Sequence, residues 1–390
     1  MITVDRLPRL LFLAARPARD TTAGQLLMHR HLLSLRNHFD VHVAHLDPPV
    51  GDERNYTMLT LSPFYQRLRH SRFGHWVEAL DATIGIAVAR RQLRRLFLRV
   101  RPDVVLTVAE PPLFLPVVAA ARSQCIPIVT IVHDWSPVWL DLRERFRPWA
   151  DRCFRQACAR STVTLSVSAE LAAEFGDAGQ HRFLPPIPGD SPSDSSLPAA
   201  PFHALYAGNF HYFQSEEISS LCQELLQRGR PDLLRVFGPE PDWSATALNS
   251  VRDGGFYAGF AKGPPLSAAF AAAGVLLVIA PFAEKWHSFA RFSFPSKLTE
   301  YCGHHRPIIL WGPEYSAAVN WARRSGAALV VTDRSAVAVV EALLDLERDQ
   351  RLQSRIAAAA AYEAQNTFAP ARLNADLLAA LTDAMHPRTV

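Results

Sequence analysis

The sequence predicts an α/β protein of two doubly wound domains, each a parallel sheet covered by helices, which face each other across a cleft. The chain has 390 residues, which exceeds a usual single core, and 49% of them are hydrophobic. Strand-like and helix-like segments alternate along the chain, a pattern typical of parallel sheets. Residues 185–201 break this alternation with a stretch dense in Pro, Ser and Asp. That stretch is the expected linker between the two domains.

The first domain is predicted over residues 1–184. Its expected strands are short runs rich in Val, Ile, Leu or Thr, and a helical pattern covers residues 25–38. These strands are 10–15, 41–46, 103–108, 126–133 and 163–167. Each is followed by a helical pattern, so the strands should be parallel and the loops after them should gather at one edge of the sheet.

The second domain is predicted over residues 202–370, where the alternation starts again. Its expected strands are 204–207, 234–237, 255–258, 274–280, 307–310 and 328–331. Residues 371–390 are expected to form a helix that packs back on the first domain. Ligands of doubly wound sheets bind beyond the carboxyl ends of the strands, so functional residues are sought in those loops.

Composition narrows the functional classes. Charged residues make up 20% of the chain and the net charge is +4, which argues against a disordered chain and against a dedicated nucleic-acid-binding protein. The five cysteines include no C-x-x-C pair, as expected in a reducing cytosol. The apolar runs are shorter than the ~18 residues that a membrane-spanning helix needs. We therefore expect a cytoplasmic enzyme without a transmembrane segment.

The segment Phe294–Tyr301 is the most informative motif. Pro295 suits the first turn of a helix, where free backbone N–H groups can bind an anion such as a diphosphate. Leu298 and Tyr301 can face the core together, which leaves Glu300 on another face. A carboxylate there can accept hydrogen bonds from the vicinal hydroxyls of a sugar. An ordinary helix start with a surface glutamate remains the alternative.

Lysine placement supports an anion site near this motif. The chain has only three lysines, Lys262, Lys285 and Lys297, whereas its other basic residues are arginines. A compact ammonium suits a phosphate oxygen, so lysines gathered in residues 262–297 indicate phosphate binding. Chance clustering is the alternative explanation.

The segment from Pro295 to Tyr301, followed by Gly303 and the strand 307–310, resembles the corresponding segment of GT-B glycosyltransferases, family 4 in particular. The resemblance is clearest over residues 203–335. It implies two Rossmann-like domains and a nucleotide diphosphate sugar held mainly by the second one. It also implies diphosphate-binding residues at Ser296, Lys297 and Leu298, and a contact between Glu300 and the ribose.

The chain departs from the family pattern at two places. The acidic residue expected eight positions before Glu300 is replaced by Phe292, which leaves the donor sugar and the stereochemistry open, although retaining hexosyl transfer is expected. Gly208 and Asn209 stand where the family usually has a basic pair, and both are expected to bind the donor. Lys285 follows the strand 274–280 and is a candidate for catalysis by charge stabilisation.

Two further loops carry candidate residues. His133 and Asp134 come at the end of the strand that begins at residue 126, directly after Val132; the resemblance implies a histidine beside the donor sugar, and Asp134 could fix its tautomer. A strand-end cap is the alternative. In the first loop, Gly24 permits close backbone contact with a phosphate. Gly259 and Phe260 are expected to lie near the base of the nucleotide.

These features favour transfer of a sugar from a nucleotide diphosphate sugar to a hydroxyl of a glycan, lipid-linked or small-molecule acceptor, as in polysaccharide or glycolipid assembly. The sequence contains no Asp-x-Asp, so we expect no metal, and no cofactor beyond the donor itself. A catalytically inactive nucleotide-sugar-binding or scaffold protein, or a sugar-nucleotide epimerase, remains an alternative. Arg91, Arg94, Arg95 and Arg99 share one helix face, which predicts either peripheral contact with an anionic membrane or a solvated surface.

Overall fold

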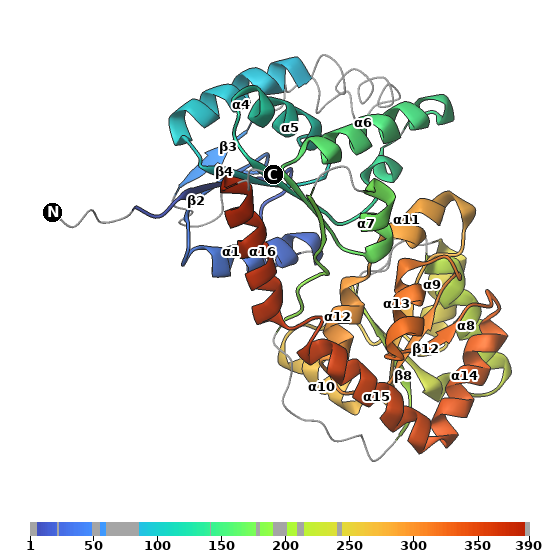
Figure 1. The fold of residues 1–390 in the computed structure, drawn as a ribbon. Helices are drawn as coiled ribbons and strands as arrows, with labels where there is room; N and C mark the ends of the chain where they lie inside the picture. Colours follow the sequence, from blue (N-terminus) through green and yellow to red (C-terminus); the bar gives the residue numbers. More distant parts are fainter. Residues whose placement is uncertain are drawn as a thin grey trace. The chain divides into compact units, whose positions relative to one another are not determined.

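A computed structural model describes most of the chain: residues 6–21, 23–48, 55–59, 86–140, 142–176, 180–189, 201–208, 214–239 and 244–386. The chain divides into two compact units. The N-terminal unit comprises Met1–Pro185 together with Leu373–Val390, and the C-terminal unit comprises Pro186–Arg372. Each unit contains one parallel sheet flanked by helices (Figure 1), so the predicted α/β class with two parallel sheets is confirmed.

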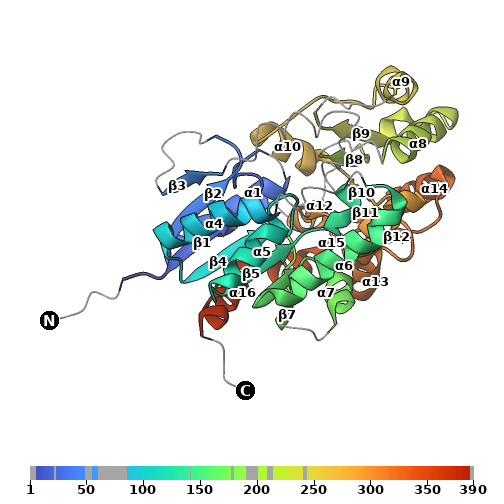
Figure 2. The same ribbon diagram turned by 90° about the horizontal axis from the view of Figure 1, so that it is seen from above.

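The N-terminal unit contains a seven-stranded sheet in the order β3-β2-β1-β4-β5-β6-β7, and Figure 2 labels all of these strands except β6. Its strands are β1 (Arg9–Leu13), β2 (Asp40–His45), β3 (Tyr56–Met58), β4 (Val104–Val108), β5 (Ile128–Val132), β6 (Val163–Ser166) and β7 (Gln180–Phe183). All neighbouring strands are parallel. Every residue of β4, β5 and β6 is buried, as expected for central strands covered on both faces.

The helices of this unit form layers on the two faces of the sheet. They are α1 (Ala23–Leu35), α4 (Ile86–Val100), α5 (Phe114–Ser123), α6 (Arg147–Arg160), α7 (Ala169–Phe175) and α16 (Pro370–Met385), with short 3-10 helices η2 (Ser136–Trp139) and η3 (Glu144–Phe146). Figure 1 shows α4, α5 and α6 on one side of the sheet and α1 and α16 on the other.

Helix α4 is amphipathic, as its sequence predicts. Leu93, Phe97 and Val100 are buried against the rest of the unit. The arginines on the opposite face, Arg91, Arg94, Arg95 and Arg99, are exposed. The sequence pattern places Ile86 on the same apolar face, but its side chain lies outside the described residues.

Helix α16 completes the N-terminal unit although it lies at the end of the chain. Leu373, Leu377 and Leu381 are buried along one of its faces. Two polar contacts fix the same helix: Asn374 Oδ1 lies 2.9 Å from His31 Nδ1 on α1, and Arg182 of β7 donates to Asp383 at 2.6 Å.

The C-terminal unit contains a five-stranded parallel sheet in the order β12-β11-β10-β8-β9. Its strands are β8 (Ala204–Ala207), β9 (Leu234–Phe237), β10 (Val275–Ile279), β11 (Ile308–Trp311) and β12 (Leu329–Val331). Its helices are α8 (Ser215–Gln227), α9 (Ala245–Asp253), α10 (Pro264–Ala272), α11 (His287–Phe292), α12 (Ser296–Cys302), α13 (Ala317–Ser325), α14 (Ala336–Arg348) and α15 (Gln350–Gln365), with 3-10 helices η5 (Pro231–Leu233) and η6 (Glu284–Trp286). Helix α8 contacts α9 and α14, whereas α12 contacts α15.

The prediction of a strand at residues 255–258 is wrong. Only Tyr257 forms a bridge there, with Val236 of β9. Glycines with positive φ flank this bridge, Gly255 at +71° and Gly259 at +86°. A pleated strand needs negative φ throughout, so the chain leaves the sheet on both sides of Tyr257.

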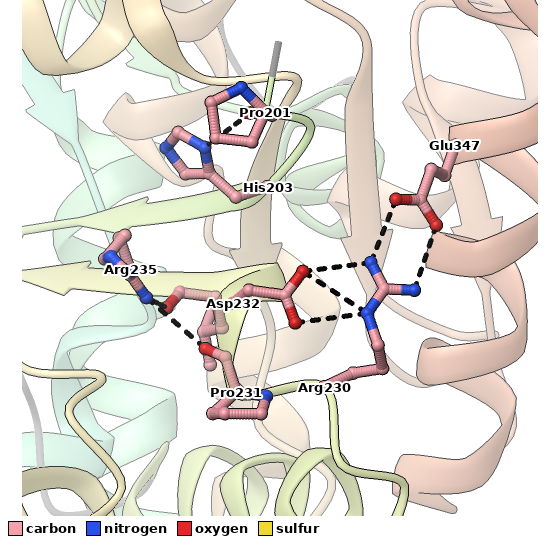
Figure 3. A network of polar contacts seen from close by, with 8 residues as sticks. Pro201, His203, Arg230, Pro231, Asp232, Arg235 and Glu347 are labelled. Atoms are coloured by element: carbon pink, nitrogen blue, oxygen red, sulfur yellow. Dashed lines mark hydrogen bonds and ion pairs between the residues drawn. The ribbon is translucent and has the colours of Figure 1, made fainter.

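An ion-pair network lies at the amino end of β9 (Figure 3). Arg230 donates to Asp232, two residues ahead, and to Glu347 at the end of α14, with its Nη2 lying 3.0 and 2.9 Å from their carboxylate oxygens. Ligands of parallel sheets bind at the carboxyl ends of the strands, which is the opposite edge of the sheet from this network. We therefore assign the network a structural role.

Candidate functional site

Each sheet has one position where the order of its strands reverses. In the N-terminal unit the chain passes from β1 to β2 and β3 on one side, then returns to β4 on the other side of β1. In the C-terminal unit β8 is followed by β9 on one side, and β10 to β12 continue on the other. Ligands of doubly wound sheets bind beyond the carboxyl ends of the strands at this switch point. The loops after β1 and β4, and those after β8 and β10, are therefore the places to examine.

In the C-terminal unit, helix α12 is fixed to the carboxyl end of β8. The hydroxyl of Tyr301 donates to the carbonyl of Ala207 at 3.0 Å and accepts from the N–H of the same residue at 2.9 Å. Leu298, Tyr301 and Cys302 are fully buried, whereas Glu300 is only half-buried. The motif therefore forms the predicted helix with the predicted face inward.

A chain of hydrogen bonds holds Lys297 at the same place. Lys297 Nζ donates to Tyr206 Oη at 2.6 Å and lies 4.0 Å from the centre of the Tyr206 ring. Tyr206 Oη donates in turn to Gln214 Oε1 at 2.7 Å, and Gln214 Nε2 donates to the carbonyl of Ile279 at 2.8 Å. The chain links α12 to the ends of β8 and β10, the two strands at the switch point.

Gly208, directly after β8, lies against this lysine. Its φ is +139°, and a Cβ added there would lie 2.2 Å from Lys297 Cε and 2.8 Å from Nζ. Real contacts of this kind are never so short, so a side chain at this position would displace the end of the lysine, and the positive φ itself favours glycine. The structure thus brings the predicted residues Gly208, Lys297 and Glu300 together. Asn209 lies outside the described residues.

Burial is the main influence on the Lys297 ammonium and lowers its pKa to about 7, although the neighbouring carboxylate of Glu300 acts in the opposite direction. Near neutral pH the lysine is therefore divided between its charged and neutral forms. An anion bound beside Nζ would favour the charged form.

The other residues of the motif have defined places. The carbonyl of Ser296 accepts a hydrogen bond from the Thr299 hydroxyl at 2.9 Å. The N–H of Leu298 donates to the carbonyl of Pro295 at 2.9 Å, so this amide does not point outward as the sequence suggested. Phe292, which replaces the expected acidic residue, is buried. The Arg291 guanidinium lies 4.8 Å from the centre of its ring.

The remaining candidates of this unit lie in exposed loops. Lys285 lies in η6, and its ammonium is 5.8 Å from the Trp286 ring centre. The side chain of Phe260 is 59% exposed, next to Gly259, and the Lys262 ammonium lies 5.6 Å from its ring centre.

In the N-terminal unit, His133 and Asp134 follow β5. Burial, with a smaller contribution from His31, lowers the pKa of His133 to about 4, so its imidazole is neutral at physiological pH. The next residue, Trp135, anchors the loop: its indole donates to Asp151 at 2.8 Å and the Arg155 guanidinium lies 4.6 Å from its ring centre.

A carboxylate that sequence reasoning missed, Glu110, lies directly after β4. Burial raises its pKa; the charge of Arg16 opposes this and that of Asp134 adds to it. A Cβ added to Gly24, in the first turn of α1, would lie 3.9 Å from Glu110 Oε1. Glu110 therefore lies beside Gly24 at the switch point between β1 and β4, with Arg16 and Asp134 near enough for their charges to act on its carboxyl group. The sequence offered one indication of this residue, namely that Glu110 is an acidic residue just after the predicted strand 103–108.

The described residues contain no group of three or more His, Cys, Asp or Glu side chains that could hold a metal ion. Within the same part of the chain, no helix combines the length and apolar character needed to cross a membrane.

Known proteins resemble this chain in part of its sequence and in its fold. The sequence profile of Glycosyltransferase Family 4 matches residues 27–186. No curated protein matches the sequence of the chain. Among solved structures, the α,α-trehalose-phosphate synthase (UDP-forming) from Burkholderia vietnamiensis superposes with a TM-score of 0.69 at 13% identity, covering 99% of both chains.

Two further structures were solved with ligands. The trehalose-phosphate synthase (UDP-forming) from Burkholderia xenovorans, in complex with glucose-6-phosphate, has a TM-score of 0.67 at 12% identity over 96% of this chain and 100% of its own. HepE from Anabaena, in complex with UDP, has a TM-score of 0.65 at 13% identity over 96% of this chain and 100% of its own. The resemblance predicted from the sequence is therefore confirmed: the chain has the GT-B fold of glycosyltransferases, and its residues 27–186 match glycosyltransferase family 4.

Proposed function

We propose that the chain is a glycosyltransferase that moves a hexose-type sugar from a nucleoside diphosphate sugar to a hydroxyl acceptor. The observation that carries the proposal is the lysine beneath Gly208 at the switch point of the C-terminal sheet. The ammonium of Lys297 is held by Tyr206 and taken out of water, at the end of the sheet where ligands of this fold bind.

The C-terminal unit is the proposed donor-binding unit. In the transfer, the anomeric carbon exchanges its bond to the diphosphate for a bond to the acceptor oxygen, and negative charge grows on the leaving diphosphate. A cation already positioned in a partly dry site stabilises that charge without reorganising. Lys297 fits this role, and Lys285 is a second candidate because it follows β10 at the same switch point.

Glu300 and Phe260 are the proposed contacts of the nucleoside. Glu300 is half-buried one turn beyond Lys297 and can accept hydrogen bonds from the ribose hydroxyls. Phe260 exposes an apolar ring beside Gly259, where the base can stack. Uridine is the first nucleoside to test, because HepE was solved with UDP.

The N-terminal unit is the proposed acceptor-binding unit. His133 presents a neutral imidazole, which can donate and accept one hydrogen bond each, next to Asp134. The acceptor is a glycan, a lipid-linked sugar or a small molecule with a free hydroxyl, as in polysaccharide assembly.

We also propose a retaining outcome, no requirement for a metal or another cofactor, and a cytoplasmic location. The exposed arginines of α4 suit the headgroups of an anionic membrane, where a lipid-linked acceptor would be presented.

The test is a screen of nucleotide sugars for release of nucleoside diphosphate, with EDTA present to remove metals. Wild type should release UDP or another nucleoside diphosphate from at least one donor. The Lys297→Met variant should lose at least tenfold in turnover, whereas Arg351→Met, which removes an exposed cation of α15 in the same unit, should keep it. UDP binding without any release would instead favour the inactive nucleotide-sugar-binding protein.

A further inference from the structure

Glu110 lies at the place in the N-terminal sheet where a ligand is expected. It follows β4 by two residues, while Arg16 follows β1 by three, and these two strands flank the switch point. Nothing in the donor-binding arrangement of the C-terminal unit accounts for a half-buried carboxyl group here.

The backbone around Glu110 is rigidly held. The N–H of Glu110 donates to the carbonyl of Val108 at 2.7 Å, and its own carbonyl accepts from Phe114 at 3.2 Å. The preceding residue, Ala109, donates to Ile131 of β5 at 2.8 Å and accepts from the Ser136 hydroxyl. These bonds tie the loop after β4 to the loop after β5, so the backbone that carries the Glu110 side chain is held in place.

The carboxylate itself makes no hydrogen bond to any described residue. Its Oε1 faces the backbone of the first turn of α1, at the surface left free by the missing side chain of Gly24. A ligand hydroxyl that donates a hydrogen bond to a half-buried carboxylate offsets part of the cost of its burial.

The charges around Glu110 indicate what such a ligand can be. Arg16 supplies one positive charge, whereas Glu110 and Asp134 are both acidic. This balance does not attract a phosphate. It suits uncharged hydroxyl groups, which can donate to the carboxylates and accept from the guanidinium.

We propose that Glu110 binds the acceptor by accepting a hydrogen bond from one of its hydroxyls, and that this subsite selects an acceptor whose reacting end is an uncharged sugar. This inference rests on the proposed transferase function, because that function requires an acceptor. It differs from a purely structural role, in which Glu110 only stabilises the amino end of α1.

The experiment measures binding of small sugars to the full chain in saturating UDP. Methyl glycosides of glucose, galactose, mannose and N-acetylglucosamine are titrated against wild type, Glu110→Gln and the control Glu144→Gln, which changes an exposed glutamate of the same unit in the same way. Glutamine keeps the size of the side chain but weakens the acceptor. The 6-phosphate of each sugar that binds is titrated in parallel.

Wild type and Glu144→Gln should bind at least one methyl glycoside, and Glu110→Gln should bind it at least tenfold more weakly. UDP affinity and melting temperature should not change, and the 6-phosphate should bind no more tightly than the methyl glycoside. The inference is overturned if no methyl glycoside binds, if Glu110→Gln binds as wild type does, if its only defect is a lower melting temperature, or if the phosphate is preferred.

The proposed transferase function fails in a different assay. One outcome is that no nucleotide sugar releases its nucleoside diphosphate, while Glu110→Gln still weakens binding of a methyl glycoside. The proposed transferase function is then refuted, and the proposed sugar-binding role of Glu110 is retained. If release occurs and Glu110→Gln leaves both sugar binding and the KM of the acceptor unchanged, the transfer stands and the role of Glu110 is wrong.

Discussion

Saturating UDP should raise the pKa of Lys297, which burial lowers to about 7 in the free chain. A phosphate oxygen about 4 Å from the ammonium, at an effective dielectric constant of about 20, contributes roughly 4 kcal/mol, which corresponds to about three pKa units. The lysine should therefore be partly neutral near pH 7 without ligand and fully charged with UDP bound.

The scarcity of lysine makes this measurable. Three lysines give at most three signals in a carbon NMR spectrum of protein labelled at lysine Cε, and Lys297→Met identifies the one of interest. Its titration midpoint should lie near pH 7 and move upward by more than one unit with UDP. A midpoint above 9 in the free chain would show that the Lys297 ammonium remains in contact with water. A midpoint unmoved by saturating UDP would place the diphosphate elsewhere.

The same burial affects stability. Because the unfolded chain holds this proton up to about pH 10.5 and the folded chain releases it near 7, the unfolded state binds more protons between these values, and stability rises with pH. Between pH 7 and 9 the gain is about 2 kcal/mol for one such group. Denaturant unfolding should show that the free energy of unfolding rises more steeply with pH in wild type than in Lys297→Met. An equal rise in both proteins would contradict this prediction.

Four further perturbations test other parts of the molecule. Glu300→Gln should weaken UDP binding by roughly 1.5–3 kcal/mol in calorimetry, since charge-assisted bonds to the ribose become neutral ones; a folded variant with unchanged affinity would exclude the ribose contact. Gly208→Ala should lower both UDP affinity and melting temperature because its Cβ would collide with the lysine, whereas Gly229→Ala, also at positive φ but with open space around it, should affect stability alone. His133→Ala should reduce turnover more than UDP affinity, and wild-type activity should show no inflection from this group near pH 6.5, because its pKa is about 4; normal turnover with a lower melting temperature would leave it a structural role. Glu347→Gln should cost less than about 1 kcal/mol in unfolding experiments and leave UDP affinity unchanged, because its ion pair is partly exposed and lies at the other edge of the sheet; a loss of UDP affinity would contradict that placement.

The sequence predicted the alternation of strands and helices and the inward face of α12, because both depend on local periodicity. It missed β3 and β7, which have only three and four residues and few apolar ones. It placed a strand at 255–258, where backbone conformations that only glycine adopts readily interrupt the pairing.

The predicted site was incomplete for a different reason. The motif and its lysine could be identified from residue types, but the packing of Lys297 under Gly208 depends on contacts between residues far apart in the chain. The hydrogen bonds through Tyr206 and Gln214 are of the same kind. Glu110 was missed because a single acidic residue after a strand is common, and only the strand order shows that β1 and β4 are neighbours at a switch point.

The return of α16 to the N-terminal unit suggests a way to divide the protein. A cut between residues 189 and 201 would leave one fragment with β1 to β7 and another that carries the whole C-terminal sheet together with α16. The leucines of α16, and its bonds to His31 and Arg182, would let the second fragment dock on the first. The two pieces, produced separately, should therefore recognise each other and reassemble, whereas a chain ending at Arg372 would lack the helix whose leucines are buried in the N-terminal unit. Helix α16 should thus hold the two fragments together in a complementation experiment.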